Sequence, residues 1–175
     1  GHLLGTDKIG RDVWARMLYG GRVSITIGIV SALGAAIVGI VLGCLSGYLG
    51  GILDKSLLRI SEVFHMFPPI MLVLIVMSLI GQGVVNMCLV FIFAEWMPVY
   101  RLIRNGFLSL REESFVEALR AMSIPKRSIM FKHILPIALS PVIVTFTIAT
   151  ASFILAEAGL SFLGLGVPSG IPTWG

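Results

Sequence analysis

The charged residues of this sequence leave three long stretches almost free of charge. No Asp, Glu, Lys or Arg occurs between Val23 and Leu53, and none occurs between His133 and Ala156. Between Val63 and Tyr100 the one charged residue is Glu95. A helix needs about 20 apolar residues to cross the hydrocarbon core of a bilayer, which is about 30 Å thick. The first and last stretches are therefore each long enough for one membrane span.

The middle stretch is too long for a single crossing. Its 38 residues would form a helix about 57 Å long. The segment 81–83, Gly-Gln-Gly, favours a turn and divides the stretch. We predict one span over 57–79, bent at Pro68 and Pro69, and another over 84–103. The sequence thus predicts four helical spans in a polytopic all-α membrane protein, because the two-residue alternation of a membrane β-barrel is absent.

The composition agrees with a membrane protein and excludes two other classes. Hydrophobic residues make up 57% of the chain and charged residues 13%, and the mean hydropathy is +0.98. A soluble domain averages about 45–50% apolar and about 25% charged residues, so it could not bury this much apolar surface. The apolar content also excludes disorder. Both cysteines lie in apolar runs, which excludes an extracellular disulfide scaffold.

Lysine and arginine are unevenly distributed over the segments between the predicted spans. Four crossings place the segments 50–65 and 101–132 on one side of the membrane, and these hold nine Lys and Arg residues. The segments on the other side hold four, all of them in 1–22, and none in 81–86 or 161–175. The positive-inside rule makes the side with nine cytoplasmic. We therefore predict that the loop 101–133 is cytoplasmic. Its positive charge favours lipid headgroups or a cytoplasmic protein, and not nucleic acid, as its partner.

Small residues recur at every fourth position along the first span. This spacing places them on one face of a helix, where small side chains let two helix backbones approach closely. Glycine is also common in membrane helices in general. Five small residues in register nevertheless favour close packing, so we expect this helix at the centre of a bundle. The residues of this stripe are Ser31, Ala35, Gly39, Gly43 and Gly47.

A short helix is predicted within the cytoplasmic loop. Ser114 and Glu117 have the spacing of a capping box, in which the two side chains cap the first turn of a helix. Good helix formers continue to Met122, and the sequence 123–125, Ser-Ile-Pro, ends the helix. Pro125 can then begin a second helix that leads into the last span.

One face of this short helix is apolar. Phe115, Leu119 and Met122 share it by their spacing. Such a face could dock into a groove on a soluble partner, with Arg120 near the interface. The helix could equally lie among lipid headgroups as an interfacial amphipathic helix. The residues alone leave both possibilities open.

Two carboxylates, Glu95 and Glu157, fall within or at the ends of predicted spans. A charge there is costly and is by default a functional hypothesis. Glu157 could line a translocation path, hold a gate by hydrogen bonding, or be a satisfied acid near the outer surface. Trp96, Tyr100 and Trp174 are expected in the aromatic belts at the membrane interfaces.

Motifs of the common enzyme classes are absent. The segment from Gly5 has glycines spaced roughly as in a phosphate-binding loop, but Arg11 and Asp12 stand where that loop needs Lys followed by Ser or Thr. Neither a zinc-protease motif nor a nucleophile elbow occurs. His65 and His133 lack partners for a metal site. We therefore expect no enzyme activity, no ATP binding, no cofactor and no metal in this chain.

Several stretches of the chain resemble a known family of membrane transporters. Glu117-Ala118-Leu119, followed by Ser123 and by Ile134-Leu135-Pro136, resembles the EAA loop of permease subunits of binding-protein-dependent ABC importers. Leu119 and Ser123 stand where that loop usually has Ala and Gly. Four further stretches resemble the C-type permease subunit of dipeptide, oligopeptide and nickel importers. They are Leu4-Gly5-Thr6-Asp7 with Gly10-Arg11-Asp12, Tyr48-Leu49-Gly50-Gly51, the segment 111–118, and the segment 157–166.

The resemblance implies a function and a set of partners. The chain would be the permease subunit of an ATP-driven importer of peptides or nickel in a prokaryotic inner (cytoplasmic) membrane, with the type I ABC importer permease fold. It would form half of the translocation pathway beside a second permease subunit. It would work with two cytoplasmic ATPase subunits and an extracytoplasmic substrate-binding protein. Residues 1–175 would be one transmembrane permease domain, truncated at both ends and holding about four of six spans.

In such permeases the EAA loop docks into the ATPase subunit and transmits its closure to the membrane helices. Glu117 could pair with a basic group of the ATPase as well as cap its own helix. Two functions of other classes stay open, namely a secondary transporter driven by an ion gradient and a non-transporting membrane scaffold. The resemblance places the coupling within the loop 101–133, at Ser114, Phe115, Glu117, Ala118, Leu119, Arg120, Met122 and Ser123.

Overall fold

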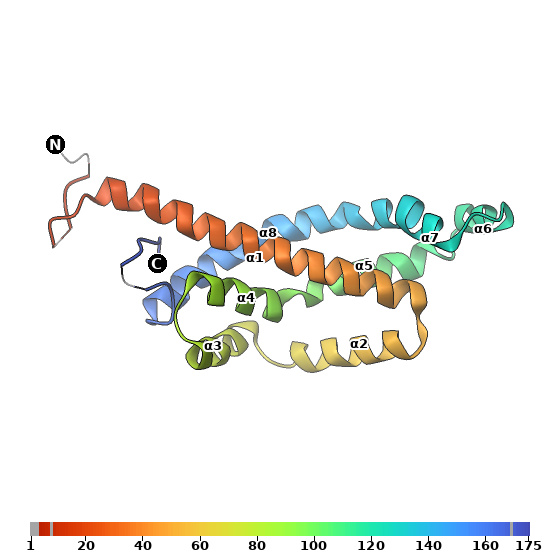
Figure 1. The fold of residues 1–175 in the computed structure, drawn as a ribbon, viewed down its shortest axis with the longest axis horizontal. Coiled ribbons are helices and arrows are strands. Elements are labelled where there is room, and N and C mark those ends of the chain that lie inside the picture. The colour runs from red at the N-terminus through yellow and green to blue at the C-terminus, as the bar shows by residue number, and fades with distance from the viewer. Residues whose placement is uncertain (1–3, 8, 169) are drawn as a thin grey trace.

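The computed structural model describes residues 4–7, 9–168 and 170–175. Lys8, one of the basic residues counted above, lies outside them. Figure 1 shows an elongated helical bundle in which α1, α5 and α8 follow the long axis, and the predicted all-α fold is confirmed. The elements are α1 Val13–Leu49, α2 Gly51–His65, α3 Pro69–Ile80, α4 Val84–Glu95, α5 Met97–Leu110, α6 Ser114–Ala121, α7 Lys126–Ser128, the π-helix η1 Ile129–Ile134, and α8 Leu135–Phe162.

Three helical stretches of the described chain are long and apolar enough to cross a membrane. They are Val13–Leu49, Val84–Leu110 and Lys126–Phe162. The helices α2 and α3 pass the same test together, but they meet at a bend of 87°. Pro68 has extended backbone angles and precedes Pro69 at the start of α3, as expected because a residue before proline avoids the helical region. The predicted span over 57–79 is thus a broken pair of helices that begins at Gly51.

The helix α1 begins well before the uncharged stretch that predicted it. It starts at Val13 and includes Arg16 and Arg22. Asp12 is its N-cap, and the Asp12 carboxylate accepts a hydrogen bond from the Trp14 backbone N–H at 3.0 Å. The charge count located the apolar part of the helix but not its start, because a charged first turn can extend beyond the hydrocarbon region.

The loop before α1 is closed by the Asp7 carboxylate. Its Oδ1 accepts from the backbone N–H groups of Ile9 and Arg11, both at 2.9 Å, and its Oδ2 accepts from Arg11 Nε at 3.0 Å. The hydrogen bond from the Arg11 backbone, with those from Ile9 and the Arg11 guanidinium, holds the pKa of Asp7 below its ordinary value. The motif that resembled the transporter family thus forms a compact turn ahead of the first span.

Prolines interrupt two of the spans without ending them. Pro98 lies in the first turn of α5, where the chain passes from α4 through Trp96. Pro136 lies at the start of α8 and follows the π-helix. A proline lacks the backbone N–H, and its ring clashes with the carbonyl four residues earlier, so a widened helical turn ahead of it relieves the clash.

The stripe of small residues on α1 faces inward. Each member of the stripe is buried. A Cβ atom added to Gly39, Gly43 or Gly47 would lie 2.7, 2.8 and 2.6 Å from the nearest side-chain atoms of α5. Any side chain at these positions would therefore collide with α5. The two helices lie this close because hydrogen atoms alone stand between their backbones.

Trp96 and Tyr100 lie inside the bundle. Their side chains are 7% and 0% exposed, and their ring centroids are 5.5 Å apart. The expectation that these two residues belong to an interface belt is wrong. The physical reason is the close approach of α5 to α1, which buries them and brings the Tyr100 hydroxyl to 3.1 Å from Ser46 Oγ.

The two ends of the bundle are distinct. The loop 81–83 lies beside the segment after α8, because Gln82 Nε2 donates to the Gly164 carbonyl at 2.6 Å. The Trp174 backbone N–H donates to Ser24 Oγ near the start of α1 at 3.2 Å. The helix α6 lies at the opposite end (Figure 1). The segments expected on one side of the membrane thus share one end of the bundle.

We expect Gly43→Ala to destabilise the bundle. The new methyl group would lie 2.8 Å from Ile103 Cβ and 2.9 Å from the Tyr100 carbonyl oxygen, and such overpacking costs about 1–3 kcal/mol. Gly159→Ala is the matched control, because nothing lies within 4 Å of its added methyl group and alanine is the better helix former. Thermal midpoints of the purified full-length protein in detergent should fall for the first variant and hold or rise for the second. Equal midpoints would contradict the close contact.

Candidate functional site

The helix α6 is carried by a short connection at the far end of the bundle (Figure 1). Of the expected loop 101–133, residues 101–110 belong to α5 and residues 126–133 to the helices that lead into α8. Val116 of α6 is fully buried and packs in one hydrophobic cluster with Cys44 of α1, Phe107 of α5 and Ala138 of α8. Through Val116, α6 thus shares a hydrophobic cluster with three of the long helices.

The start of α6 lies where the sequence predicted it, but the capping box does not form. Glu113 is the N-cap residue, and no side-chain hydrogen bond caps the helix. Ser114 is already helical, so its side chain cannot serve as the cap. The prediction that Glu117 acts by capping is therefore wrong. The Glu117 side chain is exposed and is available to a partner.

The apolar residues of α6 are divided between two directions. Leu119 packs against the same cluster as Val116. Phe115 is 36% exposed and Met122 is 71% exposed. The predicted apolar face of Phe115, Leu119 and Met122 is therefore not exposed as a whole, because Leu119 packs inward beside Val116. Ala118 and Arg120 are exposed, as Glu117 is. Arg120 Nη2 donates a hydrogen bond to the Arg111 carbonyl at 3.4 Å.

A tight turn ends α6 at Ser123. Its φ of 57° places it in the left-handed region, where few residues other than glycine lie. The Ser123 N–H donates to the Arg120 carbonyl at 3.0 Å, and the Ile124 N–H donates to the Leu119 carbonyl at 3.2 Å. These two bonds are those of a Schellman motif. Ile124 and Leu119 also pack against the same cluster, so the turn directs the chain back toward the bundle.

An ion pair that sequence reasoning missed joins α2 to α5 near this end. Arg104 Nη2 donates to Asp54 Oδ2 at 2.6 Å, and Arg104 Nε donates to Asp54 Oδ1 at 2.5 Å. Both side chains are 15% exposed. Ser46 of α1 also donates to Asp54, and its hydroxyl lies 3.1 Å from the Tyr100 hydroxyl. Such a two-pronged contact is the geometry for which arginine is suited.

Glu157 is fully buried between α1 and α8. Its Oε2 accepts from Ser24 Oγ and its Oε1 accepts from Ser161 Oγ, both at 2.7 Å. Ser24 Oγ in turn accepts from the Trp174 backbone N–H. The Glu157 carboxylate therefore ties α1, α8 and the C-terminal segment together. Its role in a pathway or gate stays a prediction.

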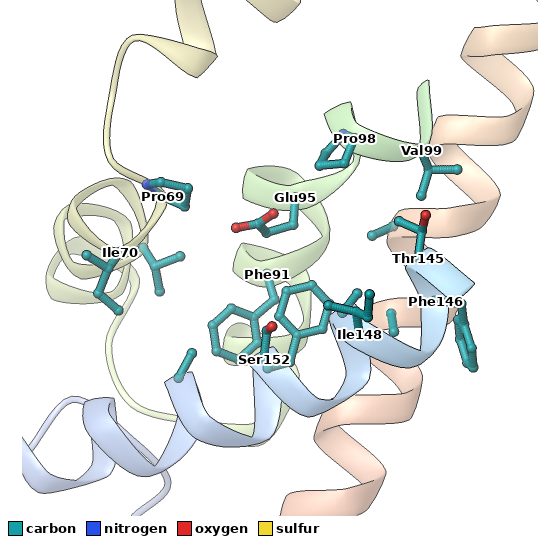
Figure 2. Close-up of a pocket in the computed structure, with 16 residues that line it drawn as sticks. Pro69, Ile70, Phe91, Glu95, Pro98, Val99, Thr145, Phe146, Ile148 and Ser152 are labelled. Carbon is teal, nitrogen blue, oxygen red and sulfur yellow. The ribbon is translucent and has the colours of Figure 1, made fainter. Parts of the chain in front are cut away.

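A cavity of about 510 Å³ lies between α1, α3, α4, α5 and α8. Most of its lining is apolar, with Phe91 and Ile148 among the larger side chains. Figure 2 shows the Glu95 carboxylate pointing into this space from the end of α4. The hydroxyl groups of Thr145 and Ser152 also line it. The sequence identified Glu95 by its charge, but it could not reveal the cavity, which depends on the positions of five helices.

Comparison with known families assigns the fold. Residues 39–175 match the family described as "Binding-protein-dependent transport system inner membrane component". The chain belongs to this family. The resemblance drawn from the motifs is thus confirmed, and the bundle is a type I ABC permease fold.

Individual relatives align along nearly the whole chain. It is 39% identical over 175 residues to the dipeptide transport system permease protein DppC of Alkalihalophilus pseudofirmus. It is 33% identical over 174 residues to the oligopeptide transport system permease protein OppC of Bacillus subtilis. It is also 39% identical over 174 residues to the glutathione transport system permease protein GsiD of Pectobacterium atrosepticum. These alignments cover 99% of this chain but 57% to 58% of each relative.

We expect Ser123→Gly to stabilise the turn after α6 and Ser123→Val to weaken it. Glycine takes the left-handed conformation freely, whereas a side chain there costs about 1 kcal/mol, and more if it is β-branched. Trypsin added to membranes should therefore cleave after Arg120 and Lys126 more slowly in the glycine variant than in the valine variant. A difference of 1 kcal/mol corresponds to about fivefold in the open population. Equal cleavage rates would contradict the strained turn.

Proposed function

We propose that the chain is the permease subunit of an ATP-driven importer of peptides. It forms half of the translocation pathway and couples to a cytoplasmic ATPase subunit through α6. The observation that carries this proposal is the position of α6. Its outer side presents Glu117, Phe115 and Met122, while its inner side packs into the cluster shared by α1, α5 and α8. A partner that moves α6 thus moves the membrane helices.

The distribution of basic residues supports the proposed orientation. The segments 50–65 and 101–132 hold nine of the thirteen Lys and Arg residues, and basic segments favour the cytoplasmic side. In that orientation α6 faces the ATPase, and the Trp174 segment faces outward. The assembly would contain a second permease subunit, two ATPase subunits and an extracytoplasmic substrate-binding protein in a prokaryotic inner membrane.

Peptides are favoured over nickel as the transported class. The relatives named above are dipeptide, oligopeptide and glutathione permeases by name, and the cavity lining is mostly apolar. In this assignment ATP hydrolysis takes place on the partner subunits and the chain itself catalyses no reaction. Its own contribution is mechanical coupling and half of the path.

The variant Glu117→Lys tests the coupling. It reverses the charge of an exposed side chain on α6 and leaves the buried Val116 and the partly buried Leu119 in place. We expect tagged full-length protein, purified in mild detergent, to retain its second permease but to recover about tenfold less ATPase than wild type. Uptake should fall in parallel, while the amount inserted in the membrane stays unchanged.

Glu112→Lys is the matched control, because it makes the same charge change on an exposed side chain just before α6. It should recover ATPase at the wild-type level. Unchanged recovery with Glu117→Lys would remove Glu117 from the coupling. A wild-type protein that emerges without any ATPase would contradict the proposed function itself and favour a secondary transporter or a scaffold.

A further inference from the structure

Glu95 is a carboxylate that the packing of the bundle does not explain. It lies at the end of α4, midway along the stretch Val84–Leu110 that is long enough to cross a membrane. Figure 2 shows its carboxylate oxygens directed into the cavity, on the side of Pro69 and Ile70. The surrounding surface is mostly aliphatic and aromatic. A charge in such a place is costly unless a partner compensates it.

Among the residues that the structure describes, none donates a hydrogen bond to the Glu95 carboxylate or forms an ion pair with it. Thr145, which also lines the cavity, donates its hydroxyl to the Pro141 carbonyl within its own helix. Glu157 provides the contrast, because two serine hydroxyls satisfy that carboxylate fully inside the bundle. Glu95 is therefore the acid of the two that can receive a ligand.

We propose that Glu95 binds the cationic side chain of a transported peptide while the peptide occupies this cavity. The inference rests on the proposed function, since it requires that a solute passes. A carboxylate in an apolar cavity favours a side chain with an apolar stem that ends in an ammonium or guanidinium group. A peptide with a lysine or arginine side chain has this chemistry. The carboxylate makes the path selective for charge, whereas the apolar wall accepts side chains of many shapes.

The test is uptake of two labelled dipeptides, Ala-Lys and Ala-Glu, by the complete transporter in proteoliposomes with ATP. Wild-type protein is compared with Glu95→Gln, which keeps the shape and removes the charge, and with Glu95→Asp, which keeps the charge. The wild-type and variant transporters use the same substrate-binding protein. Its preference for one dipeptide over the other therefore cancels when the uptake rate of a variant is divided by that of wild type for the same dipeptide. We expect Glu95→Gln to slow Ala-Lys uptake about fivefold and to leave Ala-Glu uptake equal or faster. Glu95→Asp should retain most of the preference for Ala-Lys.

Two results would overturn the inference. One is an equal effect of Glu95→Gln on both dipeptides with normal assembly. The other is a loss of assembly in Glu95→Gln with Glu95→Asp normal, because Glu95 would then pair with another subunit. Wild-type protein that takes up neither dipeptide would instead contradict the proposed function, so the two failures are distinguishable.

Discussion

The close approach of α1 to α5 sets the geometry of the rest of the bundle. Glycines on α1 let the two backbones lie closer than side chains would permit. In a membrane this matters more than in water, because apolar side chains gain little by leaving lipid and helices associate through packing. The contact also brings the Tyr100 hydroxyl to Ser46 and places Arg104 beside Asp54. Asp54 thereby joins α2 to both helices of this contact.

The contact between α1 and α5 also extends to the end of the bundle that carries α6. Phe107 reaches the stripe at Gly47 and also lies in the cluster that holds Val116. The left-handed turn at Ser123 then returns the chain to that cluster through Ile124. The helix α6 is thus attached on one side and free on the other. The proposed coupling to an ATPase needs both properties, since α6 would have to contact a partner and transmit its motion.

The carboxylates Glu157 and Glu95 lie in membrane-spanning helices and differ in their surroundings. Glu157 is surrounded by donors and joins elements that are 133 residues apart in the sequence. Glu95 faces an open cavity and has no donor among the described residues. The first fixes the structure at one end of the bundle, and the second leaves a charge available inside it. The two residues are both glutamates, so their different surroundings account for the structural role of one and the proposed selectivity role of the other.

Much of the fold could be predicted from the sequence, because the bilayer imposes simple rules. Stretches without charge located the spans, and the glycines at 81–83 located a turn. The start of α1 was missed because its first turns carry charges that the counting rule excludes. The capping box failed because Ser114 lies inside the helix and Glu113 precedes it. Local sequence could not reveal the pair Asp54 and Arg104, the burial of Trp96, or the cavity at Glu95, since each depends on helices far apart in the chain.

Reconstitution with defined energy sources tests the central claim most directly. The full-length protein, its partner permease and the ATPases would be placed in liposomes with binding protein and a labelled dipeptide. The account predicts that the dipeptide accumulates only when hydrolysable ATP is present on the side of the membrane that carries the ATPase subunits, and that an ion gradient does not change this accumulation. Accumulation driven by an ion gradient without ATP, or no uptake by an intact assembled complex, would contradict it.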